Sequence, residues 1–488
     1  MAYRDLRDYL HVLEGAGKLH HIRAEVDKEW EIAAVSRLVF QEVPEGQRPA
    51  LMFDRVRGHD IPVCVGTLGA SRWVYALAME TSPEDIPEKW ARAQRNPIAP
   101  RLVPAGPVHD EVKRGDGASL LALPAPIWTR QHDPGPYLTA PCVITRDPES
   151  GTVNVGTYRC QIKGPRKIGM WINFLQHARQ HVEPQRLAGK RVPVAIVLGP
   201  DPSVGLCSVS RIVYGVDELA VAGALRGEPL EVVSSVTSDL VVPATAEIAI
   251  EGEILPELEE EGPFGEYTGY MGPKADSYVV AVQAITHRRN PIFQAFLSQM
   301  PPSESSCIRG WGRECAILKH LRDLRLPVRD VHLLHAGGAA AYLAISMRPQ
   351  YPGQVQQVMW AAWAVDPALG KVTVVVDEDI DVRDPFQLNW ALSWRVQPSR
   401  DIVIIPNTTS VRLDPSQAAE DVPQLDATRR LSSKIGVDAT RKHTYPATSL
   451  PPAEDLARAR TRWAEYGFRD ILDAAGAATV GSARPGSL

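Results

Sequence analysis

The sequence predicts a mixed α+β protein of several domains, and three observations support that prediction. The chain has 488 residues, of which 44% are hydrophobic and 23% charged, so it can bury more than one core. Short runs rich in β-branched residues fill its middle, between glycine, proline and aspartate signals. Strand-like and helix-like segments then alternate toward the C-terminus. We therefore expect an α+β region, a β-rich region and an α/β region, in that order.

The first region, residues 1–115, is predicted to be a small α+β domain. It opens with a helix that carries Leu6, Leu10 and Leu13 on one face and ends at a pair of glycines. The strand-like segment LHHIRAEV comes next, and a helix near residues 30–42 follows it. A proline-bearing stretch closes the region.

The second region, residues 116–304, is predicted to be a barrel or a sandwich. Its segments VPVAIVLG, LVVPATAEIAIEG and SYVVAVQAITH are typical of strands. Residues 305–325 change to a helical period and read as a connecting helix. Four residues share one face of that helix: Ile308, Trp311, Cys315 and Leu318.

The third region, residues 326–445, alternates YLAISM, GQVQQVMWAAWAV, KVTVVVD, PFQLNWALSWRV and DIVIIP. This alternation predicts a parallel α/β layer. No glycine-rich phosphate fingerprint follows its strands, so a nucleotide-binding Rossmann unit is not expected. The tail, residues 446–488, begins with a predicted helix in EDLARARTRWAEYGF and ends in small residues that are expected to fray.

Charge and composition exclude several classes of function. The formal net charge is −5, and no block of basic residues would attract nucleic acid or anionic lipid. No run approaches the roughly 20 apolar residues that span a bilayer, and the N-terminus has no apolar signal core. We therefore expect a cytoplasmic protein that binds small molecules.

Familiar catalytic and metal-binding motifs are absent from the sequence. The six cysteines are scattered and form no C-x-x-C pair, so they are expected to be reduced and mostly buried. The chain contains no Walker loop, no H-E-x-x-H helix and no G-x-S-x-G turn. Any chemistry must be built from other residues.

The segment EEEGPFGEYTGY, residues 259–270, places Glu261 and Glu266 on either side of a Gly-Pro-Phe-Gly turn. Pro263 and the two glycines give the turn a defined shape, and the neighbouring aromatic residues suggest an apolar wall beside the carboxylates. A solvated acidic loop is the competing interpretation.

Three further polar segments, NVGTYR, LQHARQH and YGVDE, contribute Asn154, His177 and Glu218. An amide oxygen, an imidazole and a carboxylate together suit manganese or magnesium when phosphate completes the shell. His177 and His181 stand four residues apart, so a helical pair that binds zinc is an alternative.

These segments in this order, followed by SSKIGVDATRK at residues 432–442, resemble the UbiD-like family of reversible decarboxylases that depend on prenylated FMN. The resemblance extends over almost the whole chain, including the opening LRDYLHVLEGAGKL. It implies an N-terminal α+β domain, a central split β-barrel of the flavin-reductase type that binds the cofactor, a connecting helix, a C-terminal α/β domain and a dimerisation tail.

The resemblance also implies a set of ligand-binding residues. The expected ligands are prenylated FMN, a manganese (or magnesium) ion and a potassium ion. The residues matched to cofactor binding are Asn154, Val155, Gly156, Thr157, Tyr158, Arg159, Gln176, His177, Ser208, Ser210, Glu218 and Lys442. Those matched to the divalent ion are Asn154, His177 and Glu218, and those matched to potassium are Cys207, Ser208, Ser210 and Glu218.

The family's catalytic network is matched by Glu261, Arg159 and Glu266. Loss of carbon dioxide from an sp² carbon leaves an unstabilised carbanion, so the reaction needs an electron sink that side chains do not supply. The resemblance implies that a covalent adduct with the prenylated flavin provides it. Glu266 is then expected to protonate the product carbon, with Arg159 holding the substrate carboxylate or ordering the two glutamates.

The substrate is expected to be an aromatic, heteroaromatic or other α,β-unsaturated carboxylic acid. Trp311, Arg309 and His443 are candidate substrate contacts, although Trp311 is equally compatible with a core position. A flavin prenyltransferase is the expected cofactor supplier, and a homodimer or higher homo-oligomer the expected assembly. Two alternatives stay open: a flavin-independent metal-dependent hydrolase or lyase, and a noncatalytic flavin-binding subunit.

Overall fold

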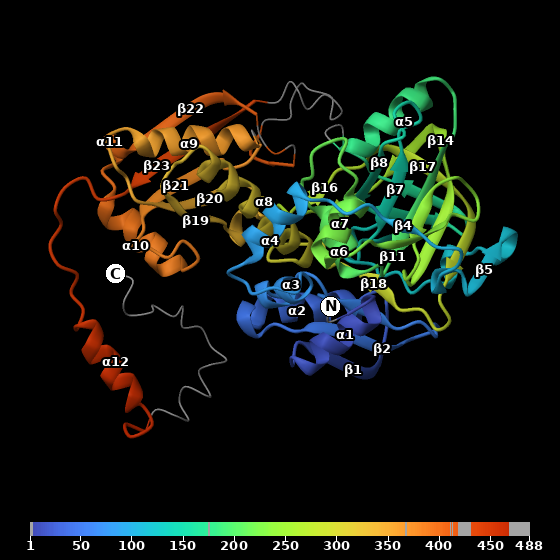
Figure 1. The fold of residues 1–488 in the computed structure, drawn as a ribbon, viewed down its shortest axis with the longest axis horizontal. Helices are drawn as coiled ribbons and strands as arrows, with labels where there is room; N and C mark the ends of the chain where they lie inside the picture. Colours follow the sequence, from blue (N-terminus) through green and yellow to red (C-terminus); the bar gives the residue numbers. More distant parts are fainter. Residues whose placement is uncertain are drawn as a thin grey trace. The chain divides into compact units, whose positions relative to one another are not determined.

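The structure, a computed structural model, describes residues 3–173, 176–366, 368–409, 411, 413–417 and 431–467. Two units divide the chain, Met1–Arg313 and Glu314–Leu488, and their boundary falls within helix α8 (Glu304–Asp323). Figure 1 shows the chain with its N-terminal elements in blue, its β-rich middle in green and yellow, and the elements after α8 in orange and red. The mixed α+β, multidomain fold predicted from the sequence is confirmed.

The N-terminal part of the first unit packs helices beside a four-stranded sheet of order β1-β2-β3-β18. Helix α1 begins where Asp5 accepts a hydrogen bond from the Asp8 amide, and it buries Leu6, Leu10 and Leu13 on the predicted face. The elements of this part are α1 (Leu6–Gly15), β1 (Leu19–Val26), α2 (Glu31–Glu42), β2 (Ala50–Val56), β3 (Val63–Val65), α3 (Arg72–Leu77), α4 (Ile86–Arg95) and β18 (Phe293–Ala295). The predicted first helix, first strand and second helix are therefore present.

The central part of the first unit is a nine-stranded sheet that curls into a half-barrel. Its order is β6-β9-β10-β17-β14-β11-β7-β8, and β5 pairs with β17. The long antiparallel pair β14 and β17 shows register shifts after Glu251 and Ile254, and such irregularities bend a sheet. The strands are β5 (Glu111–Arg114), β6 (Tyr137–Leu138), β7 (Cys142–Arg146), β8 (Val153–Thr157), β9 (Cys160–Gly164), β10 (Lys167–Met170), β11 (Val192–Leu198), β14 (Ile248–Glu261) and β17 (Ala275–His287).

Shorter elements complete the first unit around this sheet. Strands β13, β12 and β4 form a small sheet, and β15 pairs with β16 as a two-stranded ribbon. Helix α5 packs against strands β7, β8 and β14 of the half-barrel. These elements are β4 (Arg101–Leu102), α5 (His177–Leu187), α6 (Pro202–Val209), α7 (Glu218–Arg226), β12 (Glu231–Ser234), β13 (Val241–Pro243), β15 (Phe264–Gly265), β16 (Met271–Gly272) and the 3₁₀ turns Glu45–Gln47, Pro107–His109, Gly115–Gly117 and Leu120–Ala122.

The second unit contains a five-stranded sheet of order β19-β20-β21-β23-β22. Strands β20, β21 and β23 are parallel, but β19 and β22 pair antiparallel at the two edges. The elements are β19 (Val328–Leu333), a 3₁₀ turn (His335–Gly337), β20 (Tyr342–Met347), α9 (Gln354–Val365), β21 (Val372–Asp377), α10 (Pro385–Arg395), α11 (Pro398–Asp401), β22 (Ile402–Thr408), β23 (Ser432–Ala439) and α12 (Ala453–Thr461).

The prediction of a parallel layer is therefore right for the centre of this sheet and wrong for its edges. The segment between β19 and β20 is too short to hold a crossover helix, so the two strands must run antiparallel. The predicted tail helix begins as expected but ends at Thr461, and residues 468–488 lie outside the described residues.

The structure also bears on the cysteines and on membrane-spanning helices. All six cysteines are free and buried, as predicted. Among the described residues, no helix is long and apolar enough to cross a membrane.

Candidate active site

Arg159 lies between two glutamates that come more than a hundred residues later in the chain. Its Nε and Nη2 atoms donate hydrogen bonds to the Glu261 carboxylate, at 3.0 and 2.8 Å, and its Nη1 pairs with Glu266. Two of the three candidate catalytic side chains therefore contact the third. Ion pairs in which one guanidinium holds two carboxylates fix the orientation of all three groups.

Local backbone structure brings the two glutamates to this position. Glu261 is the last residue of β14, and Gly262 follows it with a φ of 89°, a left-handed conformation that favours glycine. Glu266 directly follows β15 and begins the turn into β16, where its amide donates a hydrogen bond to the Tyr270 carbonyl at 3.0 Å. A Cβ atom on Gly272 of β16 would lie 3.0 Å from the Glu266 side chain, so glycine leaves room for that carboxylate.

The network is buried among aromatic rings. The side chain of Glu261 is fully buried, and those of Arg159 and Glu266 are 10% and 15% exposed. The Arg159 guanidinium lies 5.1 Å from the centre of the Trp171 ring and 5.3 Å from that of Phe264, within range of cation–π attraction. The interpretation of this segment as a solvated acidic loop is therefore wrong.

Burial sets the proton affinity of the donor candidate. It raises the pKa of Glu266, and the positive charges of Arg159 and Arg309 only partly oppose that rise. Burial also lowers the pKa of Arg159, but Glu266 and Glu261 more than offset this, so its pKa is raised overall. The site thus contains a permanent cation beside a carboxyl group that holds its proton more tightly than an exposed glutamate does.

Two of the candidate substrate contacts lie on α8. The Arg309 guanidinium stacks on the Tyr267 ring, 3.5 Å from its centre, and burial lowers the pKa of Arg309 to about 10. Its charge acts on Glu266, which places it beside the catalytic network. Trp311 is buried and packs edge-on against Tyr75, with ring centres 5.2 Å apart, as expected of a core residue.

The candidate metal ligands converge from three elements. Asn154 is buried in β8, His177 is the first residue of α5, and Glu218 is the first residue of α7. The His177 Nδ1 atom lies 4.0 Å from a Glu218 oxygen, and the other Glu218 oxygen accepts a hydrogen bond from the Val155 amide at 3.0 Å. Asn154 donates from its Nδ2 to the Tyr158 hydroxyl at 3.1 Å. An imidazole, a carboxylate and an amide are a donor set that fits a manganese or magnesium ion.

The alternative pair of His177 and His181 does share a face of α5, but His181 is engaged elsewhere. It is buried, and its Nδ1 lies 3.0 Å from the Thr145 hydroxyl. In the part of the chain that the structure describes, no group of three or more His, Cys, Asp or Glu side chains is arranged to hold a metal ion. A zinc pair would therefore lack a third ligand of the usual type.

The remaining candidate cofactor residues of the first unit lie in β8, at the end of α6 and just before α5. Thr157 and Ser208 are joined by a hydrogen bond of 2.8 Å between their hydroxyls, which ties β8 to α6. Ser210 donates to the Leu206 carbonyl at 2.7 Å, and Cys207 is buried. A side chain on Gly156 would collide with the Tyr158 ring. Gln176, just before α5, accepts a hydrogen bond from the Asn173 amide.

Lys442 and His443 belong to the second unit. The Lys442 ammonium pairs with Asp438 at 3.0 Å and with Asp401 at 3.5 Å. His443 is exposed, and its ring lies 4.7 Å from that of Tyr445. The predicted roles of both residues toward cofactor and substrate stay predictions.

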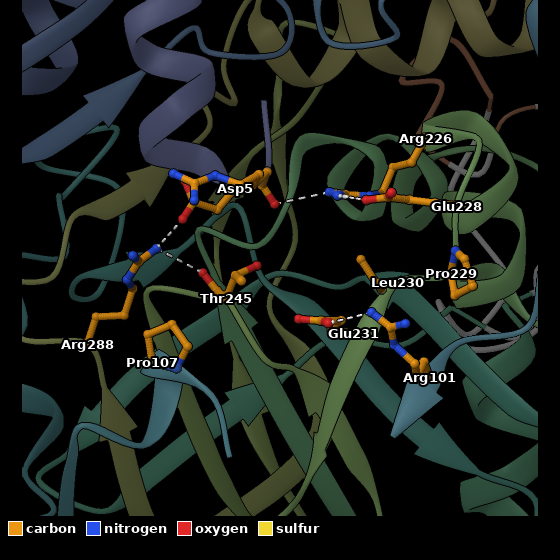
Figure 2. A pocket seen from close by; sticks show the side chains of 11 residues that line it. Asp5, Arg101, Pro107, Arg226, Glu228, Pro229, Leu230, Glu231, Thr245 and Arg288 are labelled. Atoms are coloured by element: carbon orange, nitrogen blue, oxygen red, sulfur yellow. Dashed lines mark hydrogen bonds and ion pairs between the residues drawn. The ribbon is translucent and has the colours of Figure 1, made fainter. Parts of the chain in front are cut away.

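A pocket of about 430 Å³ in the first unit contains none of the predicted site residues (Figure 2). Its walls carry paired charges: Arg288 contacts Asp5 at 2.8 Å, and Arg101 contacts Glu231 at 2.7 Å. The lining residues are Arg4, Asp5, Arg101, Pro107, Arg226, Glu228, Pro229, Leu230, Glu231, Thr245 and Arg288. Because these charged side chains pair with one another, we interpret the pocket as a structural contact between elements rather than as a ligand site.

Comparison with known protein families identifies the family to which this chain belongs. Three models of 3-octaprenyl-4-hydroxybenzoate carboxy-lyase domains match the chain: the N-terminal domain at residues 10–94, the Rift-related domain at 101–301 and the C-terminal domain at 306–439. The chain belongs to the UbiD family. The family membership predicted from the motifs is confirmed, and the chain is an enzyme of the carboxy-lyase class.

Individual UbiD relatives match over nearly their full length. An uncharacterised protein of Archaeoglobus fulgidus is 34% identical over 91% of this chain and 92% of its own, and one of Synechocystis is 32% identical over 96% and 97%. The UbiD-class enzyme HmfF from Pelotomaculum thermopropionicum, solved with FMN, is 36% identical with a TM-score of 0.83, covering 93% of this chain and 99% of its own. The 3,4-dihydroxybenzoic acid decarboxylase AroY of Klebsiella pneumoniae is 27% identical with a TM-score of 0.82, covering 93% and 99%.

Sequence reasoning missed several residues around the catalytic network. Trp171 stacks on Arg159, and Tyr137 lies against Phe264 with ring centres 4.3 Å apart. Neither belongs to a motif used for the prediction. The GPYLT segment that contains Tyr137 was a usable signal, since it is a short apolar run after a turn, but its pairing partner could not be read from the sequence.

Proposed function

We propose that this chain is a reversible, non-oxidative decarboxylase that acts with prenylated FMN on an aromatic, heteroaromatic or other α,β-unsaturated carboxylic acid, with Glu266 as the proton donor. The observation that carries the proposal is the buried network in which Arg159 holds both Glu261 and Glu266. A noncatalytic flavin-binding subunit would have no need for a buried carboxyl group with a raised pKa beside a guanidinium.

The donor set of the first unit fits the proposed cofactor. Asn154, His177 and Glu218 would hold a manganese or magnesium ion together with the flavin phosphate. A potassium ion would be held by residues at the end of α6 and at the start of α7, which are Cys207, Ser208, Ser210 and Glu218. When bound, prenylated FMN supplies the electron sink that decarboxylation at an sp² carbon requires. HmfF structures contain FMN in one case and prenylated FMN in another, which supports this assignment.

The side chains of this protein would then manage the proton. Because Glu261 occupies the Nε and Nη2 edge of Arg159, the guanidinium plane is fixed and its Nη1 is directed at Glu266. Neutral Glu266 donates a proton to the carbon that has lost carbon dioxide, and Arg159 stabilises the carboxylate that this leaves. In the direction of carboxylation, the same carboxylate removes that proton.

The finer assignments complete the proposal. Arg309, Trp311 and His443 would contact the substrate, and Lys442 the cofactor. A flavin prenyltransferase would supply the cofactor, and the protein would act in the cytoplasm as a homodimer or higher homo-oligomer. The existence of an evolved dimeric form of HmfF supports an oligomeric assembly in the wider family.

The test is a screen of unsaturated and aromatic acids for carbon dioxide release. Protein would be produced with and without a flavin prenyltransferase. We expect release only from the protein made with the prenyltransferase, because the side chains offer no electron sink. Equal release from both preparations would contradict the proposal and favour a flavin-independent metal enzyme, as would a purified protein that binds metal without flavin.

A further inference from the structure

The segment between α6 and α7 carries an aromatic side chain that has no part in the proposed ligand set. Tyr214 opens the YGVDE segment, four residues before Glu218. It lies in a turn in which the Val216 amide donates a hydrogen bond to the Val213 carbonyl at 3.1 Å. The Tyr214 side chain is 37% exposed. An exposed aromatic residue needs no explanation by itself, so its contacts decide whether it has a role.

The ring of Tyr214 packs edge-on against two histidines of α5. Its centre lies 5.2 Å from that of His177, with the two planes at 79°, and 5.9 Å from that of His181, with the planes at 62°. These are the separations and angles of attractive edge-to-face aromatic pairs. The outer torsion of a histidine side chain has only broad preferences of its own, so a packed neighbour decides which way the ring faces. Tyr214 therefore restricts the orientation of the His177 imidazole.

The hydroxyl of Tyr214 anchors the ring. It donates a hydrogen bond to Asp147 Oδ2 at 3.1 Å, and the Ser150 hydroxyl donates to the same oxygen at 2.7 Å. Asp147 Oδ1 accepts a hydrogen bond from the Glu149 amide at 3.0 Å, and the Asp147 amide donates to the Thr152 carbonyl at 2.8 Å. Asp147 is thus held by its own turn between β7 and β8, and the tyrosine is bonded to a fixed point.

These contacts join the three elements that carry the candidate metal ligands. The Asp147 turn leads into β8, which contains Asn154, while α5 begins at His177 and α7 begins at Glu218. The bond from the Val155 amide to Glu218 already connects β8 with α7. Tyr214 adds a connection from the chain just before α7 to the β7–β8 turn and to α5. One side chain therefore links all three ligand-bearing elements.

Resting on the proposed function, we propose that Tyr214 is a positioning residue for the divalent ion. Its ring, anchored by Asp147, holds the His177 imidazole in the orientation in which it binds manganese or magnesium. Histidines that bind metal ions are oriented by groups outside the ligand set, and loss of such a group lowers metal affinity by roughly 10- to 100-fold. The role is indirect, because the ring acts on the ion through His177.

The test measures manganese binding to protein that is loaded with unmodified FMN and stripped of metal by a chelator. Tyr214→Leu removes the ring and the hydroxyl, whereas Tyr214→Phe keeps the ring and loses only the bond to Asp147. Tyr351→Leu is the matched control, since Tyr351 is also partly exposed and its hydroxyl also bonds a side chain, Gln357 at 2.7 Å, in the second unit. We expect the Kd for Mn²⁺ to rise roughly tenfold or more in Tyr214→Leu, to rise less in Tyr214→Phe and to stay unchanged in Tyr351→Leu.

A spectroscopic readout separates positioning from general stability. Bound Mn²⁺ is paramagnetic, so electron spin-echo modulation reports the nitrogen of a coordinated imidazole. That modulation should be present in the wild type, weakened in Tyr214→Leu and largely retained in Tyr214→Phe, while the melting temperatures of the metal-free proteins stay close together.

Unchanged affinity in Tyr214→Leu, or an equal loss in Tyr351→Leu, would overturn the positioning role. A raised Kd with unchanged nitrogen modulation would also overturn it, because His177 would then be oriented as before. A wild-type protein that binds no manganese would overturn the metal site and this role with it. Manganese binding without carbon dioxide release from any acid would overturn only the proposed reaction, and the comparison of Kd values would still decide the role of Tyr214.

Discussion

Arg159 binds Glu261 through two parallel hydrogen bonds, from Nε at 3.0 Å and from Nη2 at 2.8 Å, while a third nitrogen contacts Glu266. This geometry gives the two glutamates different tasks. Glu261 is fully buried and orients the guanidinium, whereas Glu266 is the more exposed of the two carboxyl groups. A buried guanidinium that lost one carboxylate would be free to turn toward the other, so the three groups should act as a unit.

The first prediction concerns Glu261. Glu261→Gln removes the charge that fixes Arg159, so we expect a large loss of kcat with cofactor binding retained. The losses in Glu261→Gln and Glu266→Gln should be strongly non-additive in a double-mutant cycle, because either change disables the same unit. Glu251→Gln is the matched control, since Glu251 is a buried glutamate on the same strand that binds Ser235 and Thr237 instead. Additive losses would show that the glutamates act independently.

The second prediction concerns the metal ligands. His177→Ala should lose the divalent ion and the flavin together, because both depend on the same site, while circular dichroism stays unchanged. His181→Ala should keep both ligands but lower the melting temperature, since His181 is buried against Thr145. Metal analysis of the purified variants checks this. Loss of metal in His181→Ala alone would revive the histidine-pair interpretation.

The third prediction concerns pH. Donation requires neutral Glu266, whose pKa is raised by burial, so kcat should fall as pH rises through that pKa. Stability should change in the same direction. A carboxyl group with a raised native pKa contributes stability that is fully present below its unfolded pKa and is lost as pH rises through the native one. Urea unfolding across pH should therefore show a smaller decline in Glu266→Gln than in the wild type, and equal declines would contradict the assignment.

The fourth prediction concerns Trp171, whose ring faces Arg159. Trp171→Leu removes a cation–π contact of about 0.5–2 kcal/mol and should lower kcat several-fold, with flavin content retained. Trp390→Leu is the control, because its ring lies 5.2 Å from the Arg395 guanidinium in the second unit. If both variants lose the same activity, Trp171 contributes only to general stability.

Periodicity predicted the elements that local sequence determines. The leucines of α1, the shared helical face of α8 and the strand β21 are each specified within a few residues, and all appear in the structure. The antiparallel edge at β19 was missed because strand direction there depends on the short connection to β20, and that at β22 because side-chain pattern does not reveal which strand is its partner.

The candidate site was likewise predictable only where local sequence determines it. The stiff turn between Glu261 and Glu266 was legible in the sequence, but only the family resemblance linked it to Arg159, about a hundred residues earlier. Tyr137, Gln161 and Gly169 come together through strand register, which a single sequence does not reveal. The apolar surroundings of Arg159 likewise depend on Trp171, which follows β10, and on Phe264 of β15, two residues far apart in the sequence.

The most direct test of the central claim is the fate of the proton in Glu266→Gln, loaded with prenylated FMN and supplied in heavy water with an acid that the wild type decarboxylates. Glutamine keeps the shape of the side chain and removes the acid. We expect carbon dioxide release to fall by roughly 10² or more, the scale of lost general acid catalysis, and deuterium exchange into the product to be suppressed with flavin content unchanged. Near-normal turnover and exchange in this variant would contradict the account and would make Glu261 the first alternative donor to test.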